Sequence, residues 1–248
     1  MNRNFLLGLL CLFLGTTAVF ANDFERANEQ FKAGDFAGAA ASYEKTLAAE
    51  GPRAAVFYNL GNSYQQLKRY GPAILAYERA RLFTPRDPDL LANLALARKA
   101  AAVAGEPGIH PRLDSALNFL SRHEWSWLVA GGALFLGVLA VACGAVKLPR
   151  QWVAGPACLA GFCIIAGATA LYLRRGESGR GVVLTGDAEV RLSPFESAES
   201  LGSPGDGRII RLGVKSGDFQ HIEVSGASLS GWMAVKDVAS IAGETQRL

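Results

Sequence analysis

Two long apolar stretches constrain this chain more than any other feature. They cover residues 125–146 and 152–173, only five residues separate them, and neither contains Asp, Glu, Lys or Arg. About 21 helical residues extend about 30 Å, which matches the hydrocarbon core of a bilayer. Because the connection is so short, we expect an antiparallel hairpin of two transmembrane helices. A hairpin without charge in mid-membrane gives no support for an ion pathway and is predicted to be an anchor.

Small residues recur four positions apart in both stretches. Residues of this size and spacing let helix backbones approach closely in lipid. We therefore expect close helix packing along three such pairs, which are Ala133 and Gly137, Ala140 and Gly144, and Ala157 and Gly161.

Residues 1–21 have the pattern of a secretory signal peptide. Arg3 precedes an apolar core at residues 5–14, and small residues end the segment at Ala21. A hairpin returns the chain to the side that it left, so the soluble segments before and after it share a compartment. The signal peptide predicts that this compartment is the periplasm, beside a bacterial inner membrane.

The charge and the cysteine positions argue against several kinds of function. The net charge is only +3 over 248 residues and no basic stripe is present, so nucleic-acid binding is not expected. All four cysteines lie in apolar stretches and the three histidines are scattered, so the soluble segments are predicted to have neither disulfides nor a metal site. No Gly-x-Ser-x-Gly elbow, phosphate-binding loop or zinc-binding helix occurs. We therefore expect a protein without a cofactor and without enzymatic activity.

The segment 22–104 repeats itself at a constant offset of 34 residues, which aligns Ala39 with Ala73 and Tyr43 with Tyr77. We call this offset the repeat period. The second copy has the complete pattern of Phe57, Leu60, Gly61, Tyr64, Tyr70, Ala73, Tyr77, Ala80 and Pro85. This pattern resembles the tetratricopeptide repeat, which implies paired helices that stack as a solenoid. An incomplete third copy begins near Leu90, so the segment is predicted to contain about five helices.

The resemblance to tetratricopeptide repeats implies that a peptide or a partner domain binds along a concave face. One variant of the family grips a C-terminal carboxylate, and Asn28 and Asn59 match its two asparagines. The basic positions of that variant are occupied instead by Phe24, Asp89 and Asn93. Two interpretations stay open, because the asparagines can bind a partner or can cap and bridge helices. The candidate partner-binding residues are Asn28, Asn59, Asn62 and Gln66.

From residue 181 onward, short strand-like runs alternate with Gly, Asp, Ser and Pro, which predicts a compact all-β domain. Its ordered motifs are Val190 to Pro194, Gly207, Gly217 to Phe219, Gly231 with Trp232, Asp237 with Val238, and Ile241. These motifs resemble a bacterial SH3-like domain, although Phe219 stands where that family usually has tryptophan. The resemblance implies a groove for peptidoglycan peptides or protein segments, with candidate residues Phe195, Phe219 and Trp232. Alternatively, Phe219 and Trp232 belong to the barrel core, and for Trp232 we favour the core.

The chain is thus predicted to be a multidomain membrane protein with an all-α solenoid and an all-β SH3-like barrel. Its order is a signal peptide at 1–21, tetratricopeptide repeats at 22–104, a linker at 105–124, a transmembrane hairpin at 125–173, a linker at 174–180 and an SH3-like domain at 181–248. This order resembles the BatE-like family of the Bat (Bacteroides aerotolerance) group. The resemblance implies a periplasmic scaffold for envelope stress tolerance, beside membrane proteins with von Willebrand factor A domains and, indirectly, a MoxR-type ATPase. The alternative is a cell-wall sensor whose SH3-like domain binds peptidoglycan.

Overall fold

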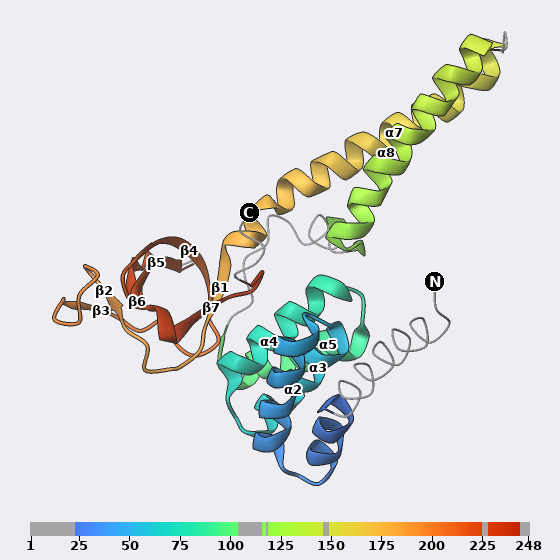
Figure 1. Ribbon diagram of the computed structural model, residues 1–248. Helices are drawn as coiled ribbons and strands as arrows, with labels where there is room; N and C mark the ends of the chain where they lie inside the picture. Colours follow the sequence, from blue (N-terminus) through green and yellow to red (C-terminus); the bar gives the residue numbers. More distant parts are fainter. Residues whose placement is uncertain (1–22, 104–115, 118, 146–148, 225–227, 244–248) are drawn as a thin grey trace, which may run out of the picture. The chain divides into compact units, whose positions relative to one another are not determined.

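The computed structural model describes residues 23–103, 116–117, 119–145, 149–224 and 228–243 (Figure 1). The chain divides into two compact units. The first combines Met1–Pro107 with Gly179–Leu248, and the second is Gly108–Ser178. The predicted signal peptide at residues 1–21 lies outside the described residues.

The first unit begins with a helical domain, which we define as residues 23–103. After a helix at 23–32 come α2 (Phe36–Glu50), α3 (Ala54–Gln66), α4 (Tyr70–Phe83) and α5 (Pro88–Ala100). Helix α4 begins one repeat period after α2, and α5 begins one repeat period after α3. The helices therefore recur with the same period as the sequence repeat.

Two aspartates define where helices of this domain begin. Asp35 Oδ1 accepts the N–H of Gly38 at 2.9 Å before α2, and Asp87 Oδ1 accepts the N–H of Leu90 at 3.2 Å before α5. Such caps satisfy N–H groups that have no partner within the helix. Pro88 then occupies the first position of α5, where its missing N–H removes no helical hydrogen bond.

Tyrosines fill the space between the helices, and small residues make room for them. Tyr43 and Tyr77, which occupy equivalent positions in successive repeats, are 1% and 0% exposed. A Cβ atom added at Gly61 would lie 2.5 Å from Cε1 of Tyr77. The absence of a side chain at Gly61 therefore allows the Tyr77 ring to pack against α3.

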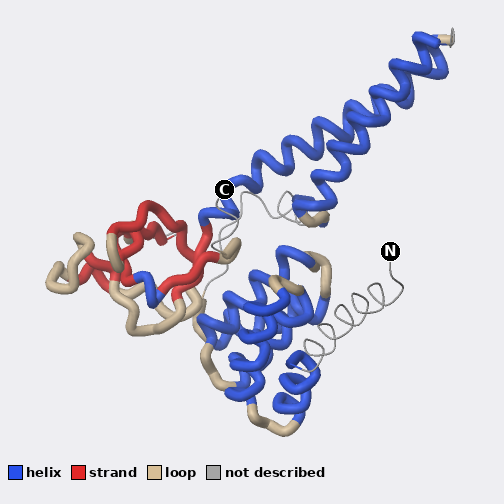
Figure 2. The backbone as a smooth tube through the Cα atoms, in the orientation of Figure 1, coloured by secondary structure: helices blue, strands red, loops and turns tan. Residues whose placement is uncertain are grey.

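The β domain, residues 180–243, is a seven-stranded sheet in which every paired strand is antiparallel. Its strands are β1 (Arg180–Val183), β2 (Val190–Arg191), β3 (Ser200–Gly202), β4 (Ile209–Ser216), β5 (Phe219–Val224), β6 (Ser230–Ala234) and β7 (Val238–Ser240). They lie in the order β3-β2-β6-β5-β4-β1-β7. Figure 2 shows the sheet curling around an interior, which holds a cluster of Val183, Ala188, Val190, Ile210, Ile222, Val224, Met233 and Val238.

The helical domain and the β domain share a second hydrophobic core. Val182, Ile209 and Ile241 of the β domain are at most 4% exposed and belong to the same cluster as Ile74 and the other buried residues of the helices. Gly207 lies so close to Ile74 that an added Cβ atom would collide with its side chain. Although the sequence predicts two separate domains, they pack into one unit.

Polar contacts reinforce this interdomain interface. Arg79 Nη2 of α4 donates a hydrogen bond to the carbonyl oxygen of Ser240 at 2.8 Å. The cap position of α4, Arg69, makes no side-chain capping bond, and the Asp206 carboxyl group lies against this helix start instead. Burial raises the pKa of Asp206, while the N–H groups of Gly71 and its neighbours oppose that shift. A carboxylate of the β domain thus lies where α4 needs an acceptor.

Glu78 of α4 is the centre of a buried ion cluster. Its side chain is 1% exposed and lies 2.7 Å from Arg81, with Arg98 of α5 in contact with its other oxygen. Burial alone would raise the pKa of Glu78, but the guanidinium groups of Arg81, Arg98 and Arg180 more than offset this and hold the pKa below its usual value. The cluster therefore links α4 to α5 and includes a charge from the β domain.

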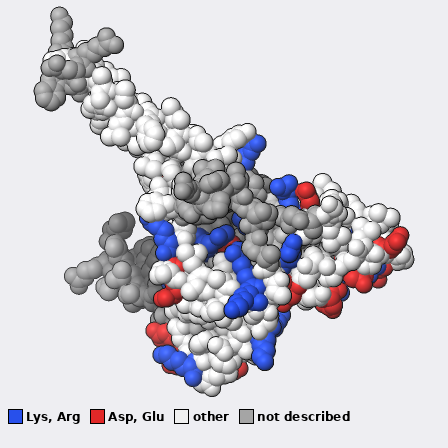
Figure 3. Space-filling view, turned by 180° about the vertical axis from the view of Figure 1, so that it is seen from behind, with Lys and Arg blue, Asp and Glu red and all other residues white. Residues whose placement is uncertain are grey.

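The second unit contains α7 (Arg122–Ala145) and α8 (Arg150–Leu173), which pack side by side. A reciprocal cap precedes α7, because the Ser121 N–H donates to Glu124 at 2.8 Å and the Glu124 N–H donates to Ser121 Oγ at 3.2 Å. Arg122–Ala145 and Val153–Leu173 are long and apolar enough to cross a membrane. Figure 3 shows an uncharged surface along these helices, in contrast to the mixed charges on the remainder of that face.

The two helices do not meet at the small residues that sequence analysis favours. A Cβ atom added at Gly132 would lie 2.8 Å from Ile164 Cγ1, and one at Gly167 would lie 2.7 Å from Val129 Cγ2. By contrast, an added Cβ atom would meet nothing within 4 Å at Gly137, Gly144 or Gly161. The expectation of close packing at those three glycines is therefore wrong, and it is Gly132 and Gly167 that lie in close contact with the neighbouring helix.

Candidate functional site

Two of the candidate asparagines in the helical domain bind each other. Asn59 Nδ2 of α3 donates to Asn28 Oδ1 at 3.1 Å, and the Tyr43 hydroxyl of α2 donates to the same oxygen at 2.6 Å. The three side chains thus connect three successive helices. All three are at least partly buried, so this network belongs to the packing of the domain.

The same triad occurs again one repeat later. Asn93 Nδ2 of α5 donates to Asn62 Oδ1 at 3.1 Å, and the Tyr77 hydroxyl donates to that oxygen at 2.8 Å. Each member lies one repeat period after its counterpart in the first triad. Of the two interpretations that sequence analysis left open for Asn59 and Asn62, the structure shows the bridge between helices.

The tyrosines of the triads remain hydrogen-bond donors. Burial raises the pKa of Tyr77, with a smaller contribution from the neighbouring Tyr58, and burial also raises the pKa of Tyr43. Tyr77 also donates to Gln65 at 2.9 Å. Gln65, which no sequence pattern indicates, therefore joins the network, whereas the candidate Gln66 is exposed at the last position of α3.

The β domain presents a row of three side chains on adjacent strands. Trp232 of β6 is in register with Arg191 of β2 on one side and with His221 of β5 on the other. The rings of Trp232 and His221 meet edge to face with centroids 5.3 Å apart. Arg191 is held by a hydrogen bond from Nη1 to the carbonyl oxygen of Ala198 at 2.9 Å. We call Arg191, Trp232 and His221 the Trp232 row.

The three aromatic candidates of this domain have different environments. Phe219 is 8% exposed, which agrees with a packing role, whereas Phe195 is 65% exposed in the connection between β2 and β3. Trp232 is half-buried beside His221, while its neighbour Met233 is 0% exposed and faces the interior. Trp232 is thus partly exposed and is not among the fully buried residues of the β-domain core. Among the described residues no ring contact joins any two of these three aromatics, and the ring contact of Trp232 is with His221.

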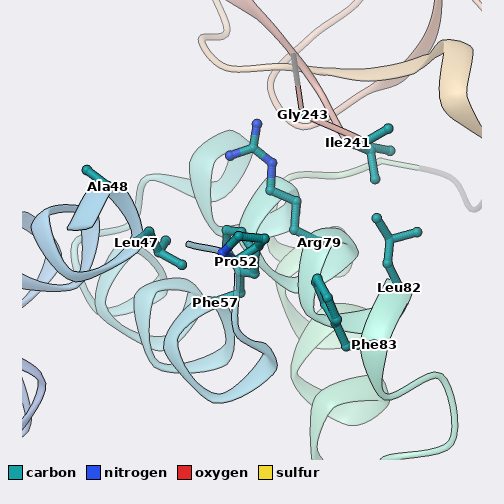
Figure 4. A pocket seen from close by; sticks show the side chains of 10 residues that line it. Leu47, Ala48, Pro52, Phe57, Arg79, Leu82, Phe83, Ile241 and Gly243 are labelled. Carbon is teal, nitrogen blue, oxygen red and sulfur yellow. The ribbon is translucent and has the colours of Figure 1, made fainter. Parts of the chain in front are cut away.

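A pocket of about 480 Å³ opens at the interdomain interface (Figure 4). Its walls come from α2, α3 and α4 and from the segment that follows β7. Phe57 and Phe83 stack within it with ring centroids 6.3 Å apart. The Arg79 side chain reaches across it towards the β domain. No sequence motif signalled this pocket, because its residues come from segments far apart in the chain.

The candidate sites of unit 1 are therefore the two asparagine triads, the Trp232 row and the interface pocket. Comparison with known proteins assigns none of them a ligand. No protein-family model matches the chain, and no curated protein matches it.

Proposed function

We propose that this protein is a membrane-anchored scaffold that presents one rigid interaction platform beside the membrane. The observation that carries this proposal is the core shared by residues before and after the apolar hairpin. Val182, Ile209 and Ile241 pack with buried residues of the helical domain. A shared core makes the two domains a single body, which suits a protein whose task is to hold partners in a defined arrangement.

The shared core also limits the membrane topology. Residues 23–103 and 180–243 can pack together only if they lie on the same side of a membrane. Two crossings by α7 and α8 meet that condition, and one crossing does not. Together with the signal-peptide pattern at residues 1–21, this favours an inner-membrane protein whose soluble unit lies in the periplasm.

We further propose that the helical domain is a tetratricopeptide-type solenoid and that the β domain is SH3-like. The helix starts that recur at the repeat period support the first assignment, and the curled antiparallel sheet supports the second. In this proposal the partners contact the exposed end of α3 at Gln66 and the Trp232 row. The asparagine triads shape the helical surface without forming a carboxylate clamp.

The partners proposed from the resemblance to BatE-like proteins are membrane proteins with von Willebrand factor A domains and, indirectly, a MoxR-type ATPase, in an assembly for envelope stress tolerance. Cross-linked membranes with tagged full-length protein provide the test. We expect mass spectrometry to find such a membrane protein, and we expect Trp232→Ala with Gln66→Ala to reduce its recovery at least about fivefold. Recovery without any von Willebrand-type partner would contradict this assignment. Thr185→Ala, an exposed change away from both candidate surfaces, is the control.

A second candidate function is a cell-wall sensor, which the half-buried Trp232 in register with Arg191 favours, because an indole offers apolar surface and Arg191 offers charged donors to a peptide ligand. The test is sedimentation of the full chain in nanodiscs with purified peptidoglycan. An isolated β domain is unsuitable, because it would expose Val182, Ile209 and Ile241. Sedimentation that depends on Trp232 would favour the sensor, and a chain that stays in the supernatant would favour the scaffold.

A further inference from the structure

The interface pocket has an almost entirely apolar lining. Its walls include Leu47, Pro52, Phe57, Leu82, Phe83 and Ile241, and among the lining residues that the structure describes, Arg79 alone has polar atoms in its side chain (Figure 4). A volume of about 480 Å³ lies within the range of small-molecule sites, which are often found between domains. The described lining thus combines an apolar wall with one cation, Arg79.

The Arg79 guanidinium is held in place but not neutralised. Nη2 donates to the carbonyl oxygen of Ser240 at 2.8 Å, and Cζ lies 5.8 Å from the centroid of the Phe57 ring. The buried Nε has no hydrogen-bond partner, and Arg79 forms no ion pair among the described residues. The adjacent Glu78 is already engaged by Arg81 and Arg98.

A partly buried guanidinium without an anion is an incomplete arrangement. Burial lowers the pKa of Arg79, but an arginine keeps its proton in proteins, so the charge remains. Desolvating such a charge is costly unless an opposite charge or further hydrogen bonds compensate. Carboxylates and phosphates both match the paired donors of a guanidinium, and the single charge of a carboxylate is the one that a lone arginine balances.

The apolar lining determines which kind of molecule can bind with its carboxylate on Arg79. A peptide buried here would need partners for its backbone N–H and C=O groups, since unpaired amides in an apolar site are unfavourable. Within the described part of the lining, Arg79 is the one side chain that offers hydrogen-bond donors. An alkyl chain needs no such partners and buries its surface favourably against Phe57, Leu82 and Phe83.

We propose that the interface pocket binds an alkyl carboxylate of the fatty-acid class, with the carboxylate on Arg79 and the chain along Phe57 and Phe83. This ligand would contact both domains, because Arg79 lies on α4 and Ile241 follows β7. Its binding would therefore stabilise the interdomain interface, since any ligand that binds only the folded state favours it. The inference does not depend on which partners the scaffold binds.

The test uses the full chain in lipid nanodiscs and a decanoic acid analogue that carries a photoreactive diazirine on its chain. After irradiation, mass spectrometry locates the label. We expect label in the segments 47–57, 79–83 and 241–243. Unlabelled decanoate should compete at least about tenfold better than methyl decanoate, which has the same chain without the charge.

Two kinds of variant separate binding from folding. Arg79→Gln removes the cation, and Ala48→Trp, at an exposed lining position, obstructs the pocket without touching Arg79. Both should reduce pocket labelling at least about tenfold while thermal unfolding shows a folded unit, and Arg79→Lys should restore part of the labelling if Arg79→Gln unfolds. Leu192→Trp, an exposed change in the β domain outside the pocket, is the control.

Three results would overturn the proposal. The first is label confined to α7 and α8, which would reflect partition of the probe into the bilayer. The second is unchanged pocket labelling in both Arg79→Gln and Ala48→Trp. The third is stronger competition by an acetylated acidic peptide such as N-acetyl-Leu-Glu-Leu than by decanoate, which would assign the pocket to a protein segment.

Discussion

Arg79 and Ser240 are separated by 161 residues, yet the Arg79 guanidinium donates a hydrogen bond to the Ser240 carbonyl at 2.8 Å. The first residue lies before the apolar hairpin and the second after it. The hairpin is therefore an insertion within one folded unit. Chain insertions are tolerated where the two ends are close on a folded unit. If the hairpin is the membrane anchor proposed above, its topology must return the chain to the side that it left for the two halves of this unit to pack together.

The interdomain interface is predicted to be sensitive to a single methyl group at Gly71. In Gly71→Ala the new Cβ atom would lie 2.6 Å from the backbone oxygen of Val183 and would also collide with Asp206. Because a backbone atom cannot move aside easily, we expect a loss of about 1–3 kcal/mol in the free energy of unfolding. Urea unfolding of the full chain in nanodiscs, followed by tryptophan fluorescence, measures this loss.

Gly186→Ala is the matched control for that measurement. Its added Cβ atom would lie 3.7 Å from Asp206 Cβ, an ordinary contact. Equal stability of the Gly71→Ala and Gly186→Ala proteins would show that the two domains do not pack closely in solution.

The buried carboxylate of Glu78 predicts a defined acid sensitivity. The pKa of Glu78 is lower in the folded chain than in the unfolded chain, where a glutamate has a pKa of about 4.3. Ionised Glu78 therefore stabilises the folded state above that pH, and this stabilisation is lost as the pH falls through the folded-state pKa. Glu78→Gln should therefore unfold about 3–5 kcal/mol more easily at neutral pH, because Arg81 and Arg98 remain without their anion. The difference in the free energy of unfolding between Glu78→Gln and the wild type should shrink below pH 4.

Urea unfolding between pH 3 and pH 7 checks this dependence. Asp206, whose pKa is raised by burial, titrates in both proteins and cancels in the difference. Glu25→Gln, an exposed change, is the control. A constant difference across this pH range would mean that Glu78 is not the group responsible.

Much of this fold follows from local patterns, and the rest depends on distant contacts. The repeat period predicts the helix starts of α2 to α5, and the length of the charge-free stretches predicts both spans. The interdomain interface could not be predicted, because Val182, Ile209 and Ile241 are apolar strand residues that would suit a barrel interior equally well. The sequence also does not determine whether Trp232 or Met233 faces the interior of the β domain. Both side chains are large and apolar, and the pairing of β6 with its neighbouring strands determines which one points inward.

The candidate sites likewise depend partly on local patterns, which the sequence shows, and partly on distant contacts, which it does not. Asn28 and Asn59 were recognisable as a pair, but their contact with each other depends on the distance between neighbouring helices. The interface pocket combines residues of α2, α3, α4 and the chain after β7, and no spacing in the sequence connects those segments. Likewise, small residues every four positions identify faces of a transmembrane helix, but the register of the hairpin decides which face meets the partner.

The asparagine triads predict energetic coupling between repeats. Asn62→Ala and Asn93→Ala remove the two ends of one hydrogen bond, and each should lower the free energy of unfolding by about 1–3 kcal/mol. The double variant should lose less free energy of unfolding than the sum of the two single losses, with a coupling energy of at least about 0.5 kcal/mol. Asn28→Ala with Asn93→Ala combines residues of different triads and should be additive. Additivity in both pairs would contradict the bridging role.

Leucine substitutions at two glycines of α7, Gly132 and Gly137, are expected to affect the packing of α7 against α8 differently. Gly132 faces Ile164 closely, whereas Gly137 has open space where a side chain would be, so Gly132→Leu should force the helices apart and Gly137→Leu should not. The expected cost at Gly132 is about 1–3 kcal/mol, typical of overpacking. The measurement is disulfide formation between Val129→Cys and Gly167→Cys in a chain whose native cysteines are replaced by alanine.

This cysteine pair reports on the contact of α7 with α8, because Val129 Cγ2 lies 2.7 Å from the Cβ position of Gly167. Rapid cross-linking is expected in the parent and in Gly137→Leu, and slow cross-linking in Gly132→Leu. If Gly137→Leu were the variant that slows the reaction, the helices would meet at the small-residue stripe that the sequence favours. Helix α7 would then be rotated by about 140° about its axis, because the two glycines are five residues apart and each residue turns the helix by about 100°.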